Sequence, residues 1–233
     1  MYCKKFAARG ASLVLTDTKK QLETLEKESE ILKSKYVVEI ERLELDVLDT
    51  KQIKDVIGNS VKRFGGVDIL VNNAGVNIIN SSISITEEQW DTVLDINLKG
   101  AFFMMQEVAK VMIKQRDGAI VNISSQHGLV GSEARAPYCA SKAGLINLSR
   151  ALAVEWAKYN IRVNTVSPTF VLTDNSKPLL DDQIFIRNNL TKIPLRRYAT
   201  PEDVANAVYF LSSEEASMVT GHSLSVDGGW TAV

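Results

Sequence analysis

The chain has 233 residues, of which 45% are apolar and 24% charged, and its formal net charge is -1. This length predicts one domain over residues 1–233, and the charge balance gives no sign of the basic surface that nucleic-acid binding needs. No apolar run reaches membrane-spanning length, and the two cysteines, Cys3 and Cys139, offer no disulfide framework. We therefore expect a reduced, cytoplasmic protein.

Short apolar segments alternate along the chain with segments of helical periodicity. The predicted strands are residues 11–16, 41–45, 67–72, 118–124, 161–166 and 224–227, and the predicted helices are 19–34, 50–64, 86–115, 137–159 and 201–212. Thr86 and Thr200 have the side chains expected at helix starts. Several strand segments are continuous apolar runs, which is typical of strands covered on both faces. The alternation predicts an α/β fold with a parallel sheet between helices, and ligands in such sheets bind beyond the carboxyl ends of the strands.

The first residues lack one part of a nucleotide-binding unit. Residues 1–9 read as the end of a helix with Gly10 as its C-cap, and Asp17 ends the strand that follows. In dinucleotide-binding units an acidic residue at this place follows a G-x-G-x-x-G turn by roughly 20 residues and bonds the ribose 2′-hydroxyl. The chain has no such glycine pattern, and counting back from Asp17 places it before Met1. We therefore expect a functional form with roughly 15–20 more residues upstream, the length of a strand and its glycine-rich turn.

Tyr138 and Lys142 are candidate proton-transfer residues at the start of the helix predicted at 137–159. Their spacing places them on one helical face, about one turn apart. A lysine ammonium beside a phenol favours the phenolate and lowers the tyrosine pKa, which suits a general acid or base near neutral pH. The pattern Y-x-x-x-K is weak alone, and a surface pair on a helix is the plainer interpretation.

Three further polar segments lie where a strand ends or a helix is interrupted. Ser125 closes the strand 118–124, where a hydroxyl faces the ligand crevice, although serine is also common in turns. Ala74 and Gly75 follow two asparagines and allow the backbone to approach a flat ligand, with an ordinary Asn/Gly turn as the alternative. Asn97 interrupts an apolar helical pattern; if buried, it needs partners and bends the helix, and otherwise it is a polar surface residue.

In this order the residues resemble the short-chain dehydrogenase/reductase family over essentially the whole chain. The matching segments are NNAG at 72–75, LDINLKG at 94–100, IVNISS at 120–125, YCASK at 138–142, IRVNTVSP at 161–168 and VTGHSLSVDGG at 219–229. The resemblance implies a Rossmann-like, doubly wound parallel sheet. It also implies an oxidoreductase that interconverts a secondary alcohol and a ketone by hydride exchange with a nicotinamide cofactor.

The same resemblance assigns the catalytic roles. Tyr138 is implied as the group that donates or accepts the substrate proton, and Lys142 as the group that lowers the pKa of Tyr138 and bonds the nicotinamide ribose. Ser125 is implied to hold the substrate oxygen. Asn97 is implied to anchor a water molecule that links Lys142 to solvent in a proton relay.

The cofactor contacts also follow from the resemblance. Asn73, Ala74 and Gly75 are implied to border adenosine and ribose, Asp46 and Val47 the adenine, and Pro168, Val171 and Thr173 the nicotinamide end. A carboxylate at Asp17 favours a ribose diol and repels a 2′-phosphate, and no arginine stands beside it. We therefore expect NAD, with NADP less favoured and no metal. A helix N-cap is a second, compatible role for Asp17.

Two departures from the family pattern bear on the fold. Thr169 follows Pro168 where the family usually has glycine, which restricts the backbone there. The family's first strand lies centrally, between the strands predicted here at 11–16 and 67–72. Without it we expect a gap in the sheet, unpaired strand edges and a cofactor diphosphate without its helix N-terminus.

The substrate is less closely indicated. The segments SPTFVLTD and DGGW resemble those of sugar, sugar-acid or polyol dehydrogenases, and residues 173–194 are implied to form a lid over the substrate. A 3-oxoacyl-(acyl-carrier-protein) reductase shares most motifs but usually employs NADPH, which Asp17 argues against. A non-catalytic scaffold is the other alternative.

His127 lies either at the crevice mouth or in an ordinary loop. We expect a homotetramer or homodimer acting on a small-molecule alcohol or ketone, with neither nucleic acid nor membrane as partner.

Overall fold

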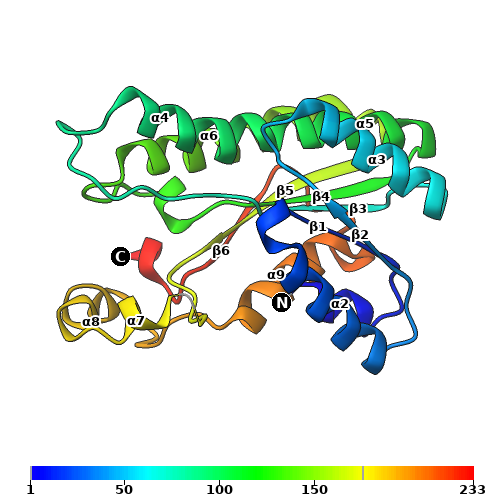
Figure 1. Cartoon of the computed structure of the whole chain (residues 1–233). Coiled ribbons are helices and arrows are strands. Elements are labelled where there is room, and N and C mark those ends of the chain that lie inside the picture. Colours follow the sequence, from blue (N-terminus) through cyan, green and yellow to red (C-terminus); the bar gives the residue numbers. More distant parts are fainter. Residues whose placement is uncertain (1, 175) are drawn as a thin grey trace.

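The computed structural model describes residues 2–174 and 176–233, so Met1 of the predicted first helix lies outside the described residues. Helices cover both faces of parallel strands (Figure 1). One layer contains α3 (Thr50–Phe64), α4 (Glu87–Leu94), α5 (Ala101–Gln115) and α6 (Ala136–Trp156); the other contains α1 (Tyr2–Ala7), α2 (Leu22–Lys35) and α9 (Pro201–Ser212). The predicted α/β arrangement is confirmed. None of the helices in the described residues has the length and apolar character needed to cross a membrane.

Within residues 2–174 and 176–233 the parallel strands form two sheets. β1 (Leu13–Asp17) pairs with β2 (Ile40–Glu44), while β3 (Ile69–Asn72), β4 (Gly118–Ile123), β5 (Ile161–Pro168) and β6 (Ser223–Val226) pair in that order. Among the described residues no ladder joins β1 to β3, which leaves one unpaired edge on each strand. The expected gap in the sheet is therefore present.

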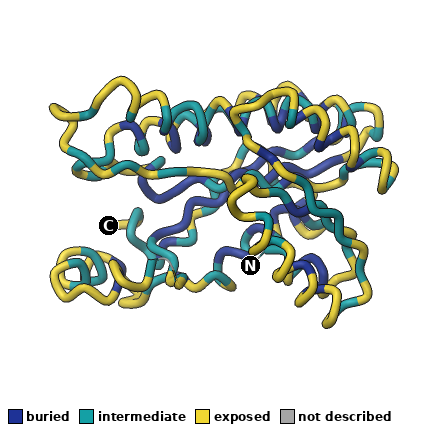
Figure 2. Tube along the Cα trace, viewed as in Figure 1, coloured by how far each residue is buried: buried dark blue, intermediate teal, exposed yellow. Residues whose placement is uncertain are grey.

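The central strands are buried on both faces because their side chains alternate between two cores. Ile120 of β4 packs in the core beneath α5 and α6, whereas its neighbour Val121 packs against α9. Val163 and Val166 of β5 divide between the same two cores. Figure 2 shows this buried zone running between the helical layers. Continuous apolar runs were the sequence signal for this burial.

Two helix starts are fixed by reciprocal caps. Thr86 caps α4 through a capping box with Gln89, and Thr200 caps α9 through a capping box with Asp203, with Pro201 as the first helical residue. Each cap satisfies backbone N–H groups that a helix start leaves without intrahelical partners. The predicted starts at Thr86 and Thr200 are confirmed.

The helix predicted at 86–115 is not continuous. A π-helical segment, Asp95–Gly100, separates α4 from α5 and contains the buried Asn97. Such π-bulges are rare and are frequent at functional sites. The long helix was predicted as a single element because its apolar pattern continues through the interruption.

The described part of the segment expected to act as a lid contains two short α-helices. These are α7 (Lys177–Leu180) and α8 (Gln183–Asn189), which lie beside the C-terminal end of the chain, at the left of Figure 1. Asn175, within the same expected lid, lies outside the described residues. The segment thus projects from the ends of β5 and β6, next to the predicted ligand crevice.

Candidate active site

A cavity of about 220 Å³ lies beyond the carboxyl ends of β4 and β5. Its walls are Tyr2, Asn73, Ile123, Ser124, Ser125, Tyr138, Pro168, Thr169, Val171 and Val204. The structure therefore brings together the predicted catalytic residues Ser125 and Tyr138 and the predicted cofactor residues Asn73, Pro168 and Val171. Tyr2 also lines the cavity, and its hydroxyl donates to Asn73 Oδ1 over 3.1 Å. No sequence motif pointed to Tyr2.

The turn that carries Ser125 is packed tightly onto α6. Ser124 Oγ donates to the Lys142 carbonyl over 3.0 Å, and Ser125 Oγ accepts the His127 N–H over 3.1 Å. A Cβ on Gly128 would lie 2.8 Å from Ser124 Oγ and 2.9 Å from the Lys142 carbonyl oxygen. Only glycine allows this approach, which places Ser125 beside the first turns of the helix that carries Tyr138.

Lys142 is buried beneath the loop that follows β3. Lys142 is only 4% exposed, and its Nζ donates to the Ile123 carbonyl over 2.8 Å. A Cβ on Gly75 would lie 3.3 Å from Nζ, so the glycine allows the loop to pass directly over the ammonium. Burial lowers the pKa of Lys142 to about 8. The lysine thus keeps a proton at neutral pH but holds it less tightly than an exposed lysine does.

The expected effect of Lys142 on Tyr138 is not found in this structure. Burial raises the pKa of Tyr138, and the opposing influence comes from Ser125 and Arg135. Lys142 Nζ lies 5.7 Å from the centre of the Tyr138 ring and is bonded to the Ile123 carbonyl, so its charge is not directed at the phenol oxygen. The predicted lowering of the Tyr138 pKa is therefore wrong here, because desolvation outweighs the neighbouring charges. Tyr138 is a neutral phenol and a proton donor at neutral pH.

Asn97 joins the loop after β3 to the helix that carries Tyr138. Its Oδ1 accepts the Val76 N–H over 2.7 Å, and Nδ2 donates to the Val76 carbonyl over 2.9 Å and to Ser141 Oγ over 3.0 Å. Ser141 Oγ in turn donates to the Tyr138 carbonyl over 2.8 Å. Asn97 is 0% exposed, so the buried interpretation is confirmed and the surface interpretation is wrong.

The water relay assigned to Asn97 stays a prediction. Both Nδ2 hydrogens are bonded to protein groups, to the Val76 carbonyl and to Ser141 Oγ. A water held by this residue would therefore have to use the remaining lone pair of Oδ1 or the backbone carbonyl.

A second buried polar chain supports the same loop. Asn72 Nδ2 donates to Asn122 Oδ1 over 2.9 Å and to the Ala101 carbonyl over 3.2 Å. Asn122 Nδ2 donates to Ser149 Oγ over 2.9 Å. Asn122 and Ser149, like Ser141, were missed from sequence. Asn122 carried a signal, since a polar residue inside the apolar run IVNI requires a partner.

The remaining predicted cofactor residues do not line the cavity. Asp17 is exposed at the end of β1, and its Oδ1 accepts the Thr18 N–H over 2.7 Å. It is not the N-cap of the helices that follow, whose N-caps are Thr18 and Gln21, so that alternative role is wrong.

Local contacts hold the other residues of this group. Asp46 Oδ1 accepts the Leu48 N–H, and Val47 packs against Gly100, where a Cβ would meet its carbonyl oxygen at 2.9 Å. Thr173 exchanges hydrogen bonds with Ser176. Ala74 and Gly75 are exposed in the loop after β3.

Thr169 replaces the expected glycine without backbone strain, because its φ is not positive. The residue is 8% exposed, and Oγ1 has no hydrogen-bond partner within residues 2–174 and 176–233. Since Thr169 lines the cavity with Ser125 and Tyr138, it adds an unpaired polar group to the site.

Comparisons with known proteins identify the family. The sequence model of a family described as enoyl-(acyl carrier protein) reductase matches residues 2–231. The chain is 42% identical over 225 residues to the 3-oxoacyl-(acyl-carrier-protein) reductase FabG of Thermotoga maritima, covering 96% of this chain and 89% of the relative. It is 37% identical over 227 residues to the NAD-dependent glycerol dehydrogenase of Listeria innocua, covering 97% and 86%.

Solved structures share the fold. A crystal structure of a gluconate 5-dehydrogenase from Burkholderia cenocepacia, in complex with NADP and tartrate, matches with a TM-score of 0.91 at 29% identity, over 100% of this chain and 90% of that chain. Sequence and structure thus agree on the Rossmann-like fold. The chain belongs to the short-chain dehydrogenase/reductase family and is an oxidoreductase of the kind that acts on CH–OH groups.

Proposed function

We propose that this protein interconverts a secondary alcohol and a ketone with NAD as its cofactor, and that the alcohol is a polyol, a sugar or a sugar acid. The observation that carries the proposal is the shared cavity. Ser125 and Tyr138 line it together with Pro168 and Val171, the residues implied at the nicotinamide end. A substrate oxygen placed between the two hydroxyls would therefore lie next to a nicotinamide ring.

The residues present fit a nicotinamide cofactor at its two ends. At the nicotinamide end, Pro168 and Val171 line the cavity together with Thr169, whose Oγ1 is buried without a hydrogen-bond partner among the described residues. At the adenosine end, the exposed Asp17 carboxylate is placed at the carboxyl end of β1, where it would accept from a ribose diol. The sequence holds no G-x-G-x-x-G turn, so no residue is assigned to the diphosphate. A bound nicotinamide would supply the hydride exchange.

The side chains have distinct tasks in this reaction. Tyr138, a neutral phenol at neutral pH, donates its proton to the carbonyl oxygen during reduction and must first lose it for oxidation. The Ser125 hydroxyl donates to the same oxygen and stabilises the charge that develops there. The Lys142 ammonium, now bonded to the Ile123 carbonyl, would have to turn toward the phenol oxygen of Tyr138 to stabilise a phenolate. Asn97 and Ser141 hold the π-helical segment, α6 and the loop after β3 in fixed positions relative to one another.

Asp17 and two relatives support the choice of cofactor and substrate. The relatives include an enzyme named for NAD and a structure that holds NADP, so the family uses both cofactors. Asp17 would repel the 2′-phosphate of NADP, which favours NAD for this chain. The glycerol dehydrogenase and the gluconate 5-dehydrogenase are named for hydroxyl-rich substrates, as the proposal requires.

A second candidate is reduction of a 3-oxoacyl thioester. The 42% identity to a 3-oxoacyl-(acyl-carrier-protein) reductase favours it, since the identity to the glycerol dehydrogenase is 37%. Both candidates use Ser125, Tyr138 and Lys142 in the same way, so the catalytic residues do not separate them. Cofactor preference and substrate size separate the two candidates. A non-catalytic scaffold is a third alternative, which predicts no NADH binding.

One set of measurements tests these candidates. The purified protein is titrated with NADH and NADPH and then assayed with a polyol and sugar-acid panel and with acetoacetyl-coenzyme A. We expect NADH to bind more tightly, polyols or sugar acids to turn over, and Tyr138→Phe to abolish turnover. Preferential reduction of acetoacetyl-coenzyme A with NADPH would favour the second candidate. Absence of binding to either dinucleotide would favour the scaffold.

We also propose that the protein is a homotetramer or a homodimer. Apolar side chains are exposed on the outer helical layer, where Trp90 of α4 is 43% exposed and Val154 of α6 is 82% exposed. An association through these helices would remove them from water. Light scattering on the eluting protein would give the mass, and a mass near 25.7 kDa would exclude a stable oligomer.

A further inference from the structure

We infer that His127 determines specificity by hydrogen-bonding a hydroxyl group on the carbon next to the reacting carbon of the substrate. The inference rests on the proposed function, because Ser125 and Tyr138 define where the reacting oxygen lies. It narrows the substrate class to vicinal diols and polyols.

His127 is held against the reacting side chains. It follows Ser125 in the turn Gln126–Gly128, and its backbone N–H donates to Ser125 Oγ over 3.1 Å. Its ring packs edge-on against Tyr138, with centroids 6.5 Å apart, and against Phe170, with centroids 6.0 Å apart. His127 thus lies directly behind Ser125 and Tyr138, outside the lining of the 220 Å³ cavity, and its ring must turn toward that cavity to meet a bound group.

The imidazole is buried without using its hydrogen-bonding capacity. His127 is 8% exposed, and neither Nδ1 nor Nε2 has a hydrogen-bond partner among the described residues. Buried polar atoms are normally paired, so two unpaired atoms on one ring beside reacting groups point to a ligand. An ordinary loop histidine is the alternative, and it predicts that neither nitrogen responds to a bound alcohol.

The protonation state of His127 selects the kind of ligand. Burial, assisted by the charge of Arg135, lowers the pKa of His127 to about 4, so the ring is neutral at physiological pH. A neutral imidazole has one N–H donor and one nitrogen acceptor. A hydroxyl group both donates and accepts and is therefore its natural partner. A carboxylate or phosphate would gain no ion pair from this ring.

Aromatic rings form a wall around this position. Phe170 packs against four of them: His127, Phe185 of α8 at 5.0 Å, Trp230 at 5.8 Å and Tyr198 at 6.4 Å between centroids. This aromatic wall joins the loop after β5 to the expected lid and to the C-terminal turn. Small-molecule sites combine such apolar walls with a few placed polar groups. A polyol, with a C–H face and adjacent hydroxyls, matches both parts.

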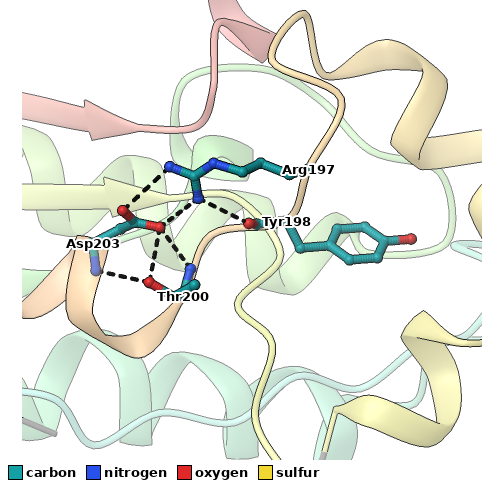
Figure 3. Close-up of polar contacts among 4 residues, drawn as sticks. All are labelled: Arg197, Tyr198, Thr200 and Asp203. Carbon is teal, nitrogen blue, oxygen red and sulfur yellow. Dashed lines mark hydrogen bonds and ion pairs between the residues drawn. The ribbon is translucent and has the colours of Figure 1, made fainter.

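The wall is anchored from outside by an ion pair. Arg197 donates to Asp203 over 2.7 and 3.3 Å and to the Tyr198 carbonyl over 3.3 Å. Figure 3 shows the Tyr198 ring pointing away from this cluster. The polar contacts thus fix the backbone of Tyr198 while its ring is left to pack on Phe170.

The first test measures selectivity. Wild type, His127→Phe and the control His222→Phe are assayed with NAD on butane-2,3-diol and butan-2-ol. Phenylalanine keeps the ring packing but removes both nitrogens, and His222 is exposed, away from the site. We expect wild type and His222→Phe to prefer the diol in kcat/KM, and His127→Phe to lose roughly 10–100-fold of that preference with little change on the monool. An unchanged preference in His127→Phe would overturn the inference.

A second test does not depend on turnover. The chain has two histidines, so imidazole ¹⁵N spectra are assigned with the His222→Phe variant. We expect butane-2,3-diol, and not butan-2-ol, to shift the His127 nitrogens. No shift with either alcohol would overturn the inference whatever the turnover.

Together the two tests separate this inference from the proposed function. If turnover depends on Tyr138 and diol preference does not depend on His127, the proposed function is supported and the inference about His127 is wrong. A diol-dependent shift without any turnover, in wild type as in Tyr138→Phe, would support the His127 site and count against the proposed function.

Discussion

Asn97 and Val76 exchange two hydrogen bonds, one from the Val76 N–H to Oδ1 over 2.7 Å and one from Nδ2 to the Val76 carbonyl over 2.9 Å. The side chain thereby completes a backbone-like pair for a loop residue that follows β3. Its third bond, to Ser141 Oγ, ties the same loop to α6. The loop that is implied to border the cofactor and the helix that carries Tyr138 are therefore held by one amide.

Replacing Asn97 by Ala should destabilise the fold and slow turnover together. The change leaves the N–H and carbonyl of Val76 and the Ser141 hydroxyl with lost partners in a buried place. We expect a loss of about 2–4 kcal/mol in the free energy of unfolding, since each unsatisfied buried group costs about 1–3 kcal/mol. Urea unfolding and steady-state kinetics measure the two effects. Asn59→Ala, an exposed position on α3, is the control, and equal behaviour of the two variants would contradict the role of Asn97.

Gly128→Ala should displace Ser125 from Tyr138. The added Cβ would lie 2.8 Å from Ser124 Oγ and 2.9 Å from the Lys142 carbonyl oxygen, and the carbonyl cannot move without shifting α6. We expect an overpacking loss of about 1–3 kcal/mol in stability and at least a tenfold fall in kcat.

Gly131→Ala is the matched control for this variant, because a Cβ there meets nothing within 4 Å. Thermal melts and kinetics compare the two variants. A fully active Gly128→Ala enzyme would show that the tight approach of the turn to α6 does not position Ser125.

The raised pKa of Tyr138 predicts how the two directions of the reaction depend on pH. Oxidation requires the phenolate, and burial keeps Tyr138 protonated at neutral pH, so kcat/KM for the alcohol should rise as the pH increases above neutrality. Reduction requires the phenol and should hold its rate at neutral pH. Initial rates in both directions, measured from neutral to alkaline pH, check this. Profiles that are the same in both directions, or a Tyr138→Phe variant with unchanged turnover, would contradict the assignment.

The sequence was sufficient for the framework of the fold because its signals are local. Apolar runs such as Gly118–Ile123 marked the buried strands, and Thr86 and Thr200 marked helix starts through their own side chains. The order of Ser125, Tyr138 and Lys142 placed the site at the carboxyl end of β4. These features depend on periodicity and capping, which residues close in sequence decide.

The details of the site could not be predicted in the same way because they depend on contacts between distant segments. The direction of the Lys142 ammonium is set by the Ile123 carbonyl, and the raised pKa of Tyr138 by burial under other elements. Asn97, within the π-helical segment, bonds to Val76 and Ser141, which lie far from it in the sequence. Phe170, at the centre of the aromatic wall, belongs to no motif.

His127 should make the fold sensitive to mild acid. Its pKa is lowered to about 4 from an ordinary value of 6.5, so the unfolded chain binds a proton more readily than the folded protein. Stability therefore rises with pH across this interval. The contribution of the neutral His127 ring to stability is fully present above about pH 6.5 and declines as the pH falls towards 4. The charged and titratable groups at this ring are Arg135, which disfavours its protonation, and the neutral Tyr138.

The measurement is the urea midpoint at several values between pH 7 and pH 4.5, for wild type and His127→Phe. We expect the variant to lose less stability over this range, because it has no imidazole to protonate. His222→Phe should follow wild type. An identical decline in His127→Phe would mean that other groups control the acid sensitivity.

Asp203 should contribute in a lower pH range through the cluster shown in Figure 3. The Arg197 guanidinium, followed by Thr200, holds the pKa of Asp203 well below its usual range. A lowered carboxyl pKa gives stability that is complete above the ordinary aspartate pKa of about 3.9 and is lost as the pH falls below it. Asp203→Asn keeps the size of the side chain but removes the charge and should lower stability by about 0.2–1 kcal/mol at neutral pH, the usual contribution of an exposed ion pair.

Thermal melts of Asp203→Asn and wild type should converge as the pH falls below about 3.9, since protonation removes the same charge from wild type. Asp55→Asn, an exposed aspartate on α3, is the control and should match wild type at every pH. A difference between Asp203→Asn and wild type that stays constant into this acidic range would show that the effect comes from packing and not from the carboxylate. The aromatic wall offers a second readout, because loosening Arg197 and the Tyr198 backbone should lower the diol preference while leaving the monool rate unchanged.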